Sequence, residues 1–160
     1  MHTHATAQKI GSPAMPAKQA RHFNEQEHRL LAIWAADCAE HVLTFFEGMY
    51  PEDDRPRKAI EAVRAWERGD LPMVDARKAA FVAHAAACTA SNAAAQAAAR
   101  AAGHAAATAH VVDHARYAAA YAVKAAAADN TSKVATAESD WQVQHLPESL
   151  RPVLFPASKR

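Results

Sequence analysis

Large apolar side chains recur at helical spacing in the first half of the chain. Between Asn24 and Tyr50 the apolar positions repeat every three or four residues, which is typical of a helix with one buried face. Asn24 is placed to cap the start, and Pro51 is placed to end it. This pattern predicts one helix over residues 24–50. Its apolar stripe consists of Leu31, Ile33, Trp34, Cys38, Val42, Phe45, Phe46 and Met49.

Two shorter helices are predicted next. Asp53 or Asp54 can cap the first of them, Pro56 suits its first turn, and Gly69 suits its end. Its predicted buried face consists of Ile60, Val63 and Trp66. The second helix is predicted over about residues 72–89. Its predicted buried face consists of Val74, Phe81, Ala85 and Cys88.

The stretch over residues 93–128 is dominated by alanine, the best helix former. Ser91 and Asn92 predict a turn and a new N-cap before it. We expect two helices with a break near residues 111–113, since one helix of this length is rare in a small domain. Alanine lets neighbouring backbones approach closely, so these helices are expected to lie centrally. The large side chains expected around them are Trp34, Phe45, Phe46, Trp66, Phe81 and Trp141.

The two ends of the chain differ from its middle. Residues 1–22 are polar without apolar periodicity, which predicts a flexible tail. Asp129 and Asn130 are predicted to end the alanine-rich run, and a short helix is expected over about residues 134–145. The predicted fold is therefore all-α. It is one bundle of about five to seven helices over residues 23–156, with alanine-rich helices at its centre.

Composition and charge exclude several classes of protein. The net charge is +1 with both signs mixed along the chain, which gives no electrostatic footprint for nucleic acid or an acidic membrane surface. No stretch approaches the roughly 20 large apolar residues of a membrane span, and no secretion signal is recognisable. We therefore expect a cytoplasmic protein. Cys38 and Cys88 are predicted to be two buried thiols and not a disulfide.

Three groups of polar side chains stand on shared helix faces. They are Trp34, Asp37, Cys38 and His41; His110, His114, Tyr117 and Tyr121; and Arg100 with His104. The spacing of His110 and His114 is one by which a helix offers two imidazoles to zinc. A third ligand would have to come from Asp37 or His41. The ordinary interpretation, polar residues on helix faces, is preferred, and no metal or cofactor is expected.

The residues give little support to catalysis. The chain has no glycine-rich phosphate loop and no nucleophile elbow. Cys38 stands beside Asp37, whose negative charge would raise the thiol pKa and weaken it as a nucleophile. The sequence therefore predicts a protein that is not an enzyme. A charged cluster that includes Asp53, Asp54, Arg55 and Arg57 is either a capping and ion-pair network or a specificity patch at a protein interface.

Several blocks of the sequence, in order, resemble one bacterial protein family. They are LAIWAADCAEHVL at residues 31–43, DDRPRKAIEA at 53–62, RAAGHAAATAH at 100–110, and WQ with HLP between 141 and 147. Over about residues 28–155 the chain is similar to the Imm-5-like putative immunity proteins. The residues that carry the resemblance most clearly are Trp34, Asp37, Cys38, Arg100, His104 and Trp141.

This resemblance implies a cytoplasmic antidote to a toxin delivered between bacteria. The leading hypothesis is a non-enzymatic helical protein that binds and neutralises a cognate toxin. The candidate contact residues are Asp53, Asp54, Arg55, Arg57, His110, His114, Tyr117 and Tyr121. A bundle that binds a metal or small ligand through His110, His114 and either Asp37 or His41 is the alternative. A homodimer paired through surplus apolar surface is compatible with the leading hypothesis.

Overall fold

The computed structural model describes residues 22–128 and 132–156, and all regular elements in this part of the chain are helical. The all-α fold class is thereby confirmed. The predicted tail over residues 1–22 and the predicted stop at Asp129 and Asn130 fall almost entirely outside the described residues. The elements are α1 (Glu25–His41), α2 (Thr44–Glu47), α3 (Arg55–Glu67), α4 (Met73–Thr89), α5 (Ala93–Ala107), α6 (His114–Ala127), α7 (Ser132–His145), the 3-10 turn η1 (Glu148–Leu150) and α8 (Arg151–Leu154).

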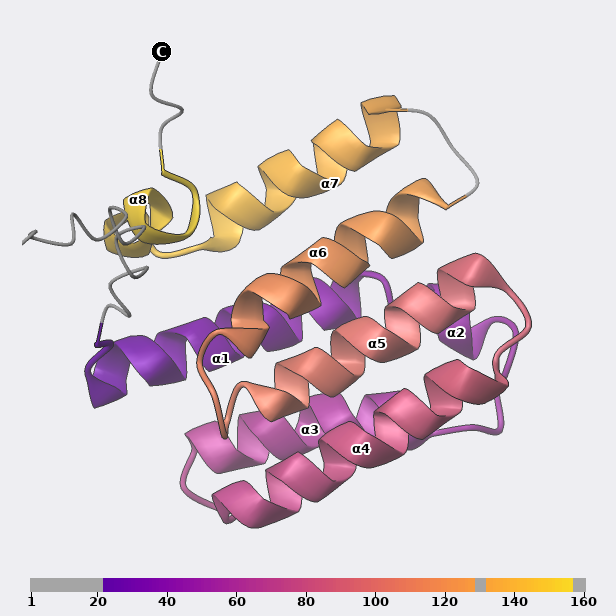
Figure 1. Ribbon diagram of the computed structural model, residues 1–160, viewed down its shortest axis with the longest axis horizontal. Coiled ribbons are helices and arrows are strands. Elements are labelled where there is room, and N and C mark those ends of the chain that lie inside the picture. Colours follow the sequence, from indigo (N-terminus) through magenta and orange to yellow (C-terminus); the bar gives the residue numbers. More distant parts are fainter. Residues whose placement is uncertain (1–21, 129–131, 157–160) are drawn as a thin grey trace, which may run out of the picture.

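Helix α5 lies at the centre of the bundle. Figure 1 shows α4, α5 and α6 side by side in front of α1 and α3, with α7 next to α6. Helix α5 contacts α1, α2, α3, α4 and α6, so these five helices pack around it. The prediction that an alanine-rich helix occupies the centre is confirmed.

Small side chains make this central position possible. The buried residues of α5 are Ala94, Ala95, Ala97, Ala98, Ala99, Ala101, Ala102, Gly103, Ala105 and Ala106. The distance between two packed helices is set by the side chains between them, so neighbouring helices can approach an alanine surface closely. The large buried side chains lie mainly on α1, α2 and the segment between them, where they fill the remaining volume: Leu31, Trp34, Leu43 and Phe46.

Local capping chemistry sets the starts of α1 and α5 and the end of α3 as expected. Asn24 and Glu27 form a reciprocal capping box at the start of α1. The side chain of Asn92 accepts a hydrogen bond of 2.9 Å from the backbone N–H of Ala95 at the start of α5. Gly69 has a φ of +82° after the end of α3, a conformation that glycine adopts without strain. The break between α5 and α6 also falls where it was predicted.

The prediction of one helix over residues 24–50 is wrong. Helix α1 ends at His41, and the separate short helix α2 follows at Thr44. The N–H groups of Val42 and Leu43 bond to carbonyls three residues back, which tightens the turn and breaks the helix. Both side chains are only 1% exposed. The break therefore lets two consecutive apolar side chains enter the core and carries the chain across to α5.

The predicted buried face of α4 is also wrong. Phe81 is 62% exposed and Val74 is 50% exposed, and Ala85 and Cys88 face solvent as well. The face of α4 that packs against the bundle consists of Ala76, Ala80, Ala83, Ala86 and Ala87. Close approach to α5 requires small residues between the helices, and that requirement outweighs the greater hydrophobicity of Phe81. Phe45, at 40% exposed, likewise lies outside the core.

The two cysteines differ in their surroundings. Cys38 is buried as predicted, whereas Cys88 is exposed because it stands on the outward face of α4. Both thiols are free. No helix within residues 22–128 and 132–156 combines the length and the apolar character that crossing a membrane requires.

Candidate functional site

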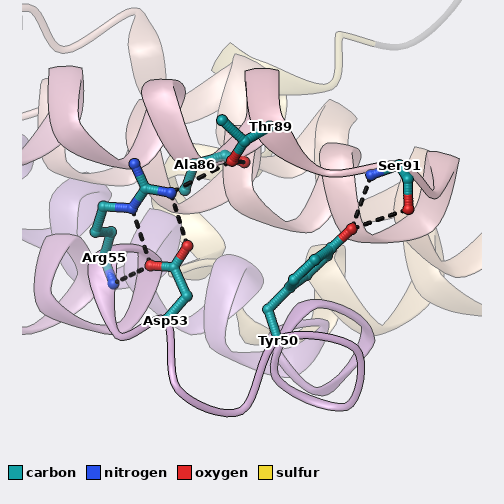
Figure 2. Close-up of polar contacts among 6 residues, drawn as sticks. All are labelled: Tyr50, Asp53, Arg55, Ala86, Thr89 and Ser91. Carbon is teal, nitrogen blue, oxygen red and sulfur yellow. Dashed lines mark hydrogen bonds and ion pairs between the residues drawn. The ribbon is translucent and has the colours of Figure 1, made fainter.

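The charged cluster around the start of α3 connects the loop before α3 to α4 through hydrogen bonds (Figure 2). The guanidinium of Arg55 donates two hydrogen bonds to the carboxylate of Asp53, of 2.9 and 2.7 Å, and one of 3.3 Å to Thr89. Asp53, and not Asp54, accepts from a backbone N–H at the start of the helix, that of Arg55. Close by, the hydroxyl of Tyr50 accepts a hydrogen bond of 2.8 Å from the backbone N–H of Ser91.

The other charges of this cluster are paired within the chain too. Arg57 donates to both carboxylate oxygens of Glu47, at 2.7 and 2.5 Å. Lys58 and Asp54 form an ion pair of 3.0 Å. Because the charges of Asp53, Asp54, Arg55 and Arg57 are internally satisfied, this predicted contact patch offers a partner few unpaired groups.

The residues of α1 that carry the family resemblance, Trp34, Asp37 and Cys38, point mainly into the fold. Trp34 is 1% exposed, and its indole N–H donates a hydrogen bond of 2.8 Å to the backbone carbonyl of Gln142. Asp37 pairs with the guanidinium of Arg64 at 2.9 Å. Burial, followed by the charges of Glu138 and Asp37, raises the pKa of the Cys38 thiol far above its ordinary value. Cys38 is therefore an inert thiol, in agreement with the argument from its neighbour in sequence.

Trp141 holds α7 against α1. Its indole is stacked between two imidazoles, with His41 at 3.7 Å and His145 at 4.0 Å between ring centroids. The Nδ1 atom of His41 also contacts the carboxylate of Glu138, which is buried on α7, at 2.9 Å. Trp141 and His41 thus fasten one helix to another. An open cavity of about 260 Å³ lies beside them, lined by Asp37, Glu40, His41, Trp141 and His145.

The densest group of polar and aromatic side chains lies on the solvent-facing side of α4, α5 and α6. We call it the histidine face and define it as His84, Arg100, His104, His114, Tyr117 and Tyr121. The three helices that carry it lie side by side (Figure 1). Arg100 and His104 stand one turn apart on α5, and His114, Tyr117 and Tyr121 follow each other at helical spacing on α6.

His104 is the centre of this face. Its ring lies 4.8 Å from that of His84, 5.3 Å from that of Tyr117 and 5.2 Å from that of Tyr121, centroid to centroid. Its Nδ1 atom lies 2.9 Å from Nδ1 of His114, so one of these two nitrogens carries the hydrogen and donates a hydrogen bond to the other. The rings of His104 and Tyr121 are close to parallel, at 10°. Residues from three helices therefore form one contiguous cluster.

His84 belongs to the cluster although the sequence reasoning missed it. Its imidazole lies directly over Gly103 of α5, where a Cβ atom would come within 2.7 Å of the ring. Glycine inside a helix costs about 1 kcal/mol relative to alanine. The lone glycine in an alanine-rich helix was therefore the one sequence signal of a close approach at this position.

The predicted pairing of His110 with His114 on one helix face is not seen. Helix α6 begins at His114, so His110 lies in the connection before it and is exposed. His114 instead contacts His104 on α5. Tyr117 and Tyr121 do continue the stripe from His114, as the sequence spacing predicted.

The imidazoles of this face are neutral near pH 7. Burial, then the charges of His84, His114 and Arg100, lowers the pKa of His104 to about 4. Burial and the charge of Arg100 also lower the pKa of His84. Burial and then His110 lower the pKa of His114, against a smaller opposing effect of Asp113. Each imidazole resists protonation mainly because it is partly buried, and the neighbouring potential cations add to this effect.

Acidification should therefore destabilise the fold. The pKa of His104 is 6.5 in an ordinary setting and about 4 in the folded chain, so between these values the unfolded chain binds more protons. The contribution of His104 to the free energy of unfolding is fully present above pH 6.5 and is lost as the pH falls towards 4. Allowing for partial exposure of the ring, we expect a loss of about 2 kcal/mol.

Urea unfolding at about pH 7.5 and about pH 4.5 measures this loss. The control is His104→Gln, which keeps a polar side chain of similar size but cannot titrate. In this variant the loss between the two pH values should shrink. An equal loss in both proteins would assign the effect to other groups.

The four proposed metal ligands do not meet in the structure. His114 contacts His104, Asp37 pairs with Arg64, and His41 pairs with Glu138. In the part of the chain that the structure describes, no group of three His, Cys, Asp or Glu side chains is arranged to hold a metal ion. This arrangement gives no support to a metal site built from these residues.

Exposed aromatic side chains and cations lie on the histidine face and next to it. Phe81 on α4 is 62% exposed and Tyr117 on α6 is 54% exposed. The guanidinium of Arg77 lies 5.5 Å from the centre of the Phe81 ring, and the ammonium of Lys124 lies 5.7 Å from that of Tyr121. Exposed aromatic side chains beside arginine are typical of surfaces that bind another protein.

Comparison with protein-family models matches residues 21–149 to the family described as Imm-5 like putative immunity protein. The match covers the described helices from α1 to α7 and the whole histidine face. No curated protein and no solved structure matches the chain.

Proposed function

Since the chain belongs to the family of Imm-5 like putative immunity proteins, we propose that it neutralises a cognate bacterial toxin by binding it, without catalysing a reaction. The family name implies that the partner is a toxin, and the histidine face is the surface that would contact it. On this proposal the protein acts in the cytoplasm of the cell that it protects. The bundle serves as a rigid support that holds the contact residues in place before the toxin arrives.

The exposure of Phe81 and Tyr117 is the observation that carries this proposal. These two aromatic side chains stand on α4 and α6, on either side of the central helix α5. Interfaces draw most of their binding energy from a few aromatic and arginine side chains. Aromatic rings also bring large contact area at low cost in conformational entropy, because they have two rotatable bonds.

The cluster around Asp53 and Arg55 is the weaker candidate surface. A partner would have to compete with the bidentate pairs Arg55–Asp53 and Arg57–Glu47, which already satisfy these groups. We therefore expect substitutions there to act on the stability of the fold and to have little effect on toxin binding.

Simultaneous replacement of Phe81 and Tyr117 by alanine should weaken toxin binding. We expect a loss of affinity of about 100-fold, because both side chains lose their contact area at the centre of the interface. The variant should fold normally, since both positions are largely exposed. Co-expression with each toxin encoded beside its gene measures rescue of growth, and calorimetry with the purified toxin measures affinity.

Phe45→Ala is the matched control. Phe45 is also an exposed aromatic residue, at 40%, but it stands on α2 outside the histidine face. It should keep full rescue and full affinity. An equal loss in both variants would place the contact elsewhere, and failure of the unmodified protein to rescue cells from any neighbouring toxin would refute the proposed function.

A further inference from the structure

Arg100 differs from most arginines of the described chain because no carboxylate pairs with it. Its guanidinium contacts Nδ1 of His84 at 3.3 Å and the sulfur of Cys88 at 3.7 Å, both weak and uncharged acceptors. Within residues 22–128 and 132–156, five other arginines have a carboxylate partner: Arg29, Arg55, Arg57, Arg64 and Arg68. A guanidinium has five N–H donors in a planar fork that matches the two oxygens of an oxyanion.

His84 contacts both Arg100 and the backbone at Gly103. His84 accepts from the guanidinium through Nδ1, because an arginine side chain has no acceptor. His84 is held in this position by lying over Gly103, where no side chain larger than hydrogen fits without displacing the ring. A glycine inside a central helix therefore maintains the contact that orients Arg100.

The charges around Arg100 are almost all positive or neutral. Helix α4 contributes His84 and Cys88, which contact the guanidinium, and α5 contributes His104 one turn away. Beyond His104 lie His114, Tyr117 and Tyr121 of α6, with Lys124 over the ring of Tyr121. The charges that act on His114 are those of His110 and Asp113. A bound anion would offset the repulsion between Arg100 and the neighbouring imidazoles. In the structure, that repulsion contributes to the low pKa of His84 and of His104.

We propose that Arg100, oriented by His84 and flanked by His104, is the anchor of an oxyanion-binding site on the histidine face. The ligand is a group with two or more terminal oxygens, either the carboxylate of a partner's Asp or Glu side chain or a free phosphate. The guanidinium donates two parallel N–H···O bonds to it. Binding favours protonation of the adjacent imidazoles, so the anion binds with uptake of protons.

Titration with inorganic phosphate at about pH 6.5 and constant ionic strength tests this site. Proton and nitrogen NMR signals of the His84, His104 and His114 rings report binding. We expect saturable shifts with a dissociation constant of about 10 mM, and at least about tenfold weaker binding in Arg100→Gln. Arg77→Gln is the matched control, because Arg77 stacks on Phe81 and is not oriented by His84, and it should bind as tightly as the unmodified chain.

Gly103→Ala tests the geometry without changing any charge. The added methyl group displaces the ring of His84, so phosphate binding should weaken while the net charge stays the same. Shifts that rise linearly without saturation, or equal binding in Arg100→Gln, would overturn the proposal. Circular dichroism melts of each variant verify that the fold is retained.

A parallel titration with acetate separates the two sources of the ligand. Saturable binding of acetate through Arg100 supports a carboxylate of a partner protein, and binding of phosphate alone supports a free phosphate or phosphate ester. These titrations contain no toxin. Their failure would leave the proposed immunity function standing, and failure of rescue would leave the oxyanion site standing.

Discussion

Replacement of Trp34 by alanine is expected to lower the free energy of unfolding by about 4 kcal/mol. Trp34 is the largest of the fully buried side chains and connects α1 with the C-terminal part of the fold. Its indole N–H bonds to Gln142, and its ring lies edge-on to Phe155 at 6.2 Å. The side chain of Gln142 in turn donates to the carbonyl of Ala119 on α6 at 2.8 Å. Loss of the indole therefore weakens the attachment of α7 to both α1 and α6.

The packing around Trp34 limits how far the other side chains can compensate for its removal. Trp34 already lines a cavity of about 330 Å³ between α6, α7 and α8, and its removal would enlarge that cavity. Surrounding helices relax only partly into such a space, which adds to the cost. Urea unfolding followed by far-ultraviolet circular dichroism measures the change. Trp34→Phe should cost less, about 2 kcal/mol, because it keeps most of the buried area. The remaining cost comes from the loss of the hydrogen bond to Gln142. A loss below about 1 kcal/mol in Trp34→Ala would contradict the assigned role.

Replacement of Ala102 by leucine is expected to cost about 3 kcal/mol, at the upper end for added volume in a packed core. Ala102 is fully buried on the central helix. Leucine is nearly as good a helix former as alanine, so the loss would come from packing and not from helix propensity. Thermal and urea unfolding measure it.

Ala93→Leu is the control for this substitution. Ala93 stands on the same helix but is exposed, so leucine there should change the stability by less than about 0.5 kcal/mol. Equal effects at both positions would show that volume at the centre of α5 does not limit the packing of its neighbours.

Local chemistry made some helix boundaries predictable, although the end of α1 at His41 was not among them. Asn24 and Asn92 cap their helices through side-chain oxygens that bond to nearby N–H groups, and such contacts involve residues three apart in sequence. A break near residues 111–113 was expected because one helix spanning residues 93–128 would be unusually long for a small domain. These features depend on neighbours in sequence, so they can be read from the chain without knowing what packs against it.

The buried face of α4 was not predictable in this way. Apolar residues recur at helical spacing on both of its faces, one with Phe81 and the other with Ala80 and Ala83. Hydrophobicity alone favours burial of Phe81. Which face of α4 is buried depends on the short distance between α4 and α5. That distance is a property of the assembled bundle and cannot be read from the sequence of α4 alone.

The candidate site was predictable in part. The one-turn spacing of His114 and Tyr117 and of Arg100 and His104 identified two of its pieces correctly. Their joining into one cluster depends on the side-by-side packing of α5 and α6, and His84 enters from a third helix. Periodicity shows which face of a helix is buried but not which two helices meet, and here Gly103 was the only local sign in the sequence that a side chain from another helix approaches.

The outward and inward positions of α4, α5 and α6 do not overlap, and this separation has an evolutionary consequence. Residues such as Phe81, Tyr117 and Arg100 can be exchanged one at a time while the interior alanines stay the same. On the proposed function, a change of toxin can therefore be met by single outward substitutions without rebuilding the scaffold. The interior alanines lack this freedom, since a larger residue there destabilises the packing between the helices.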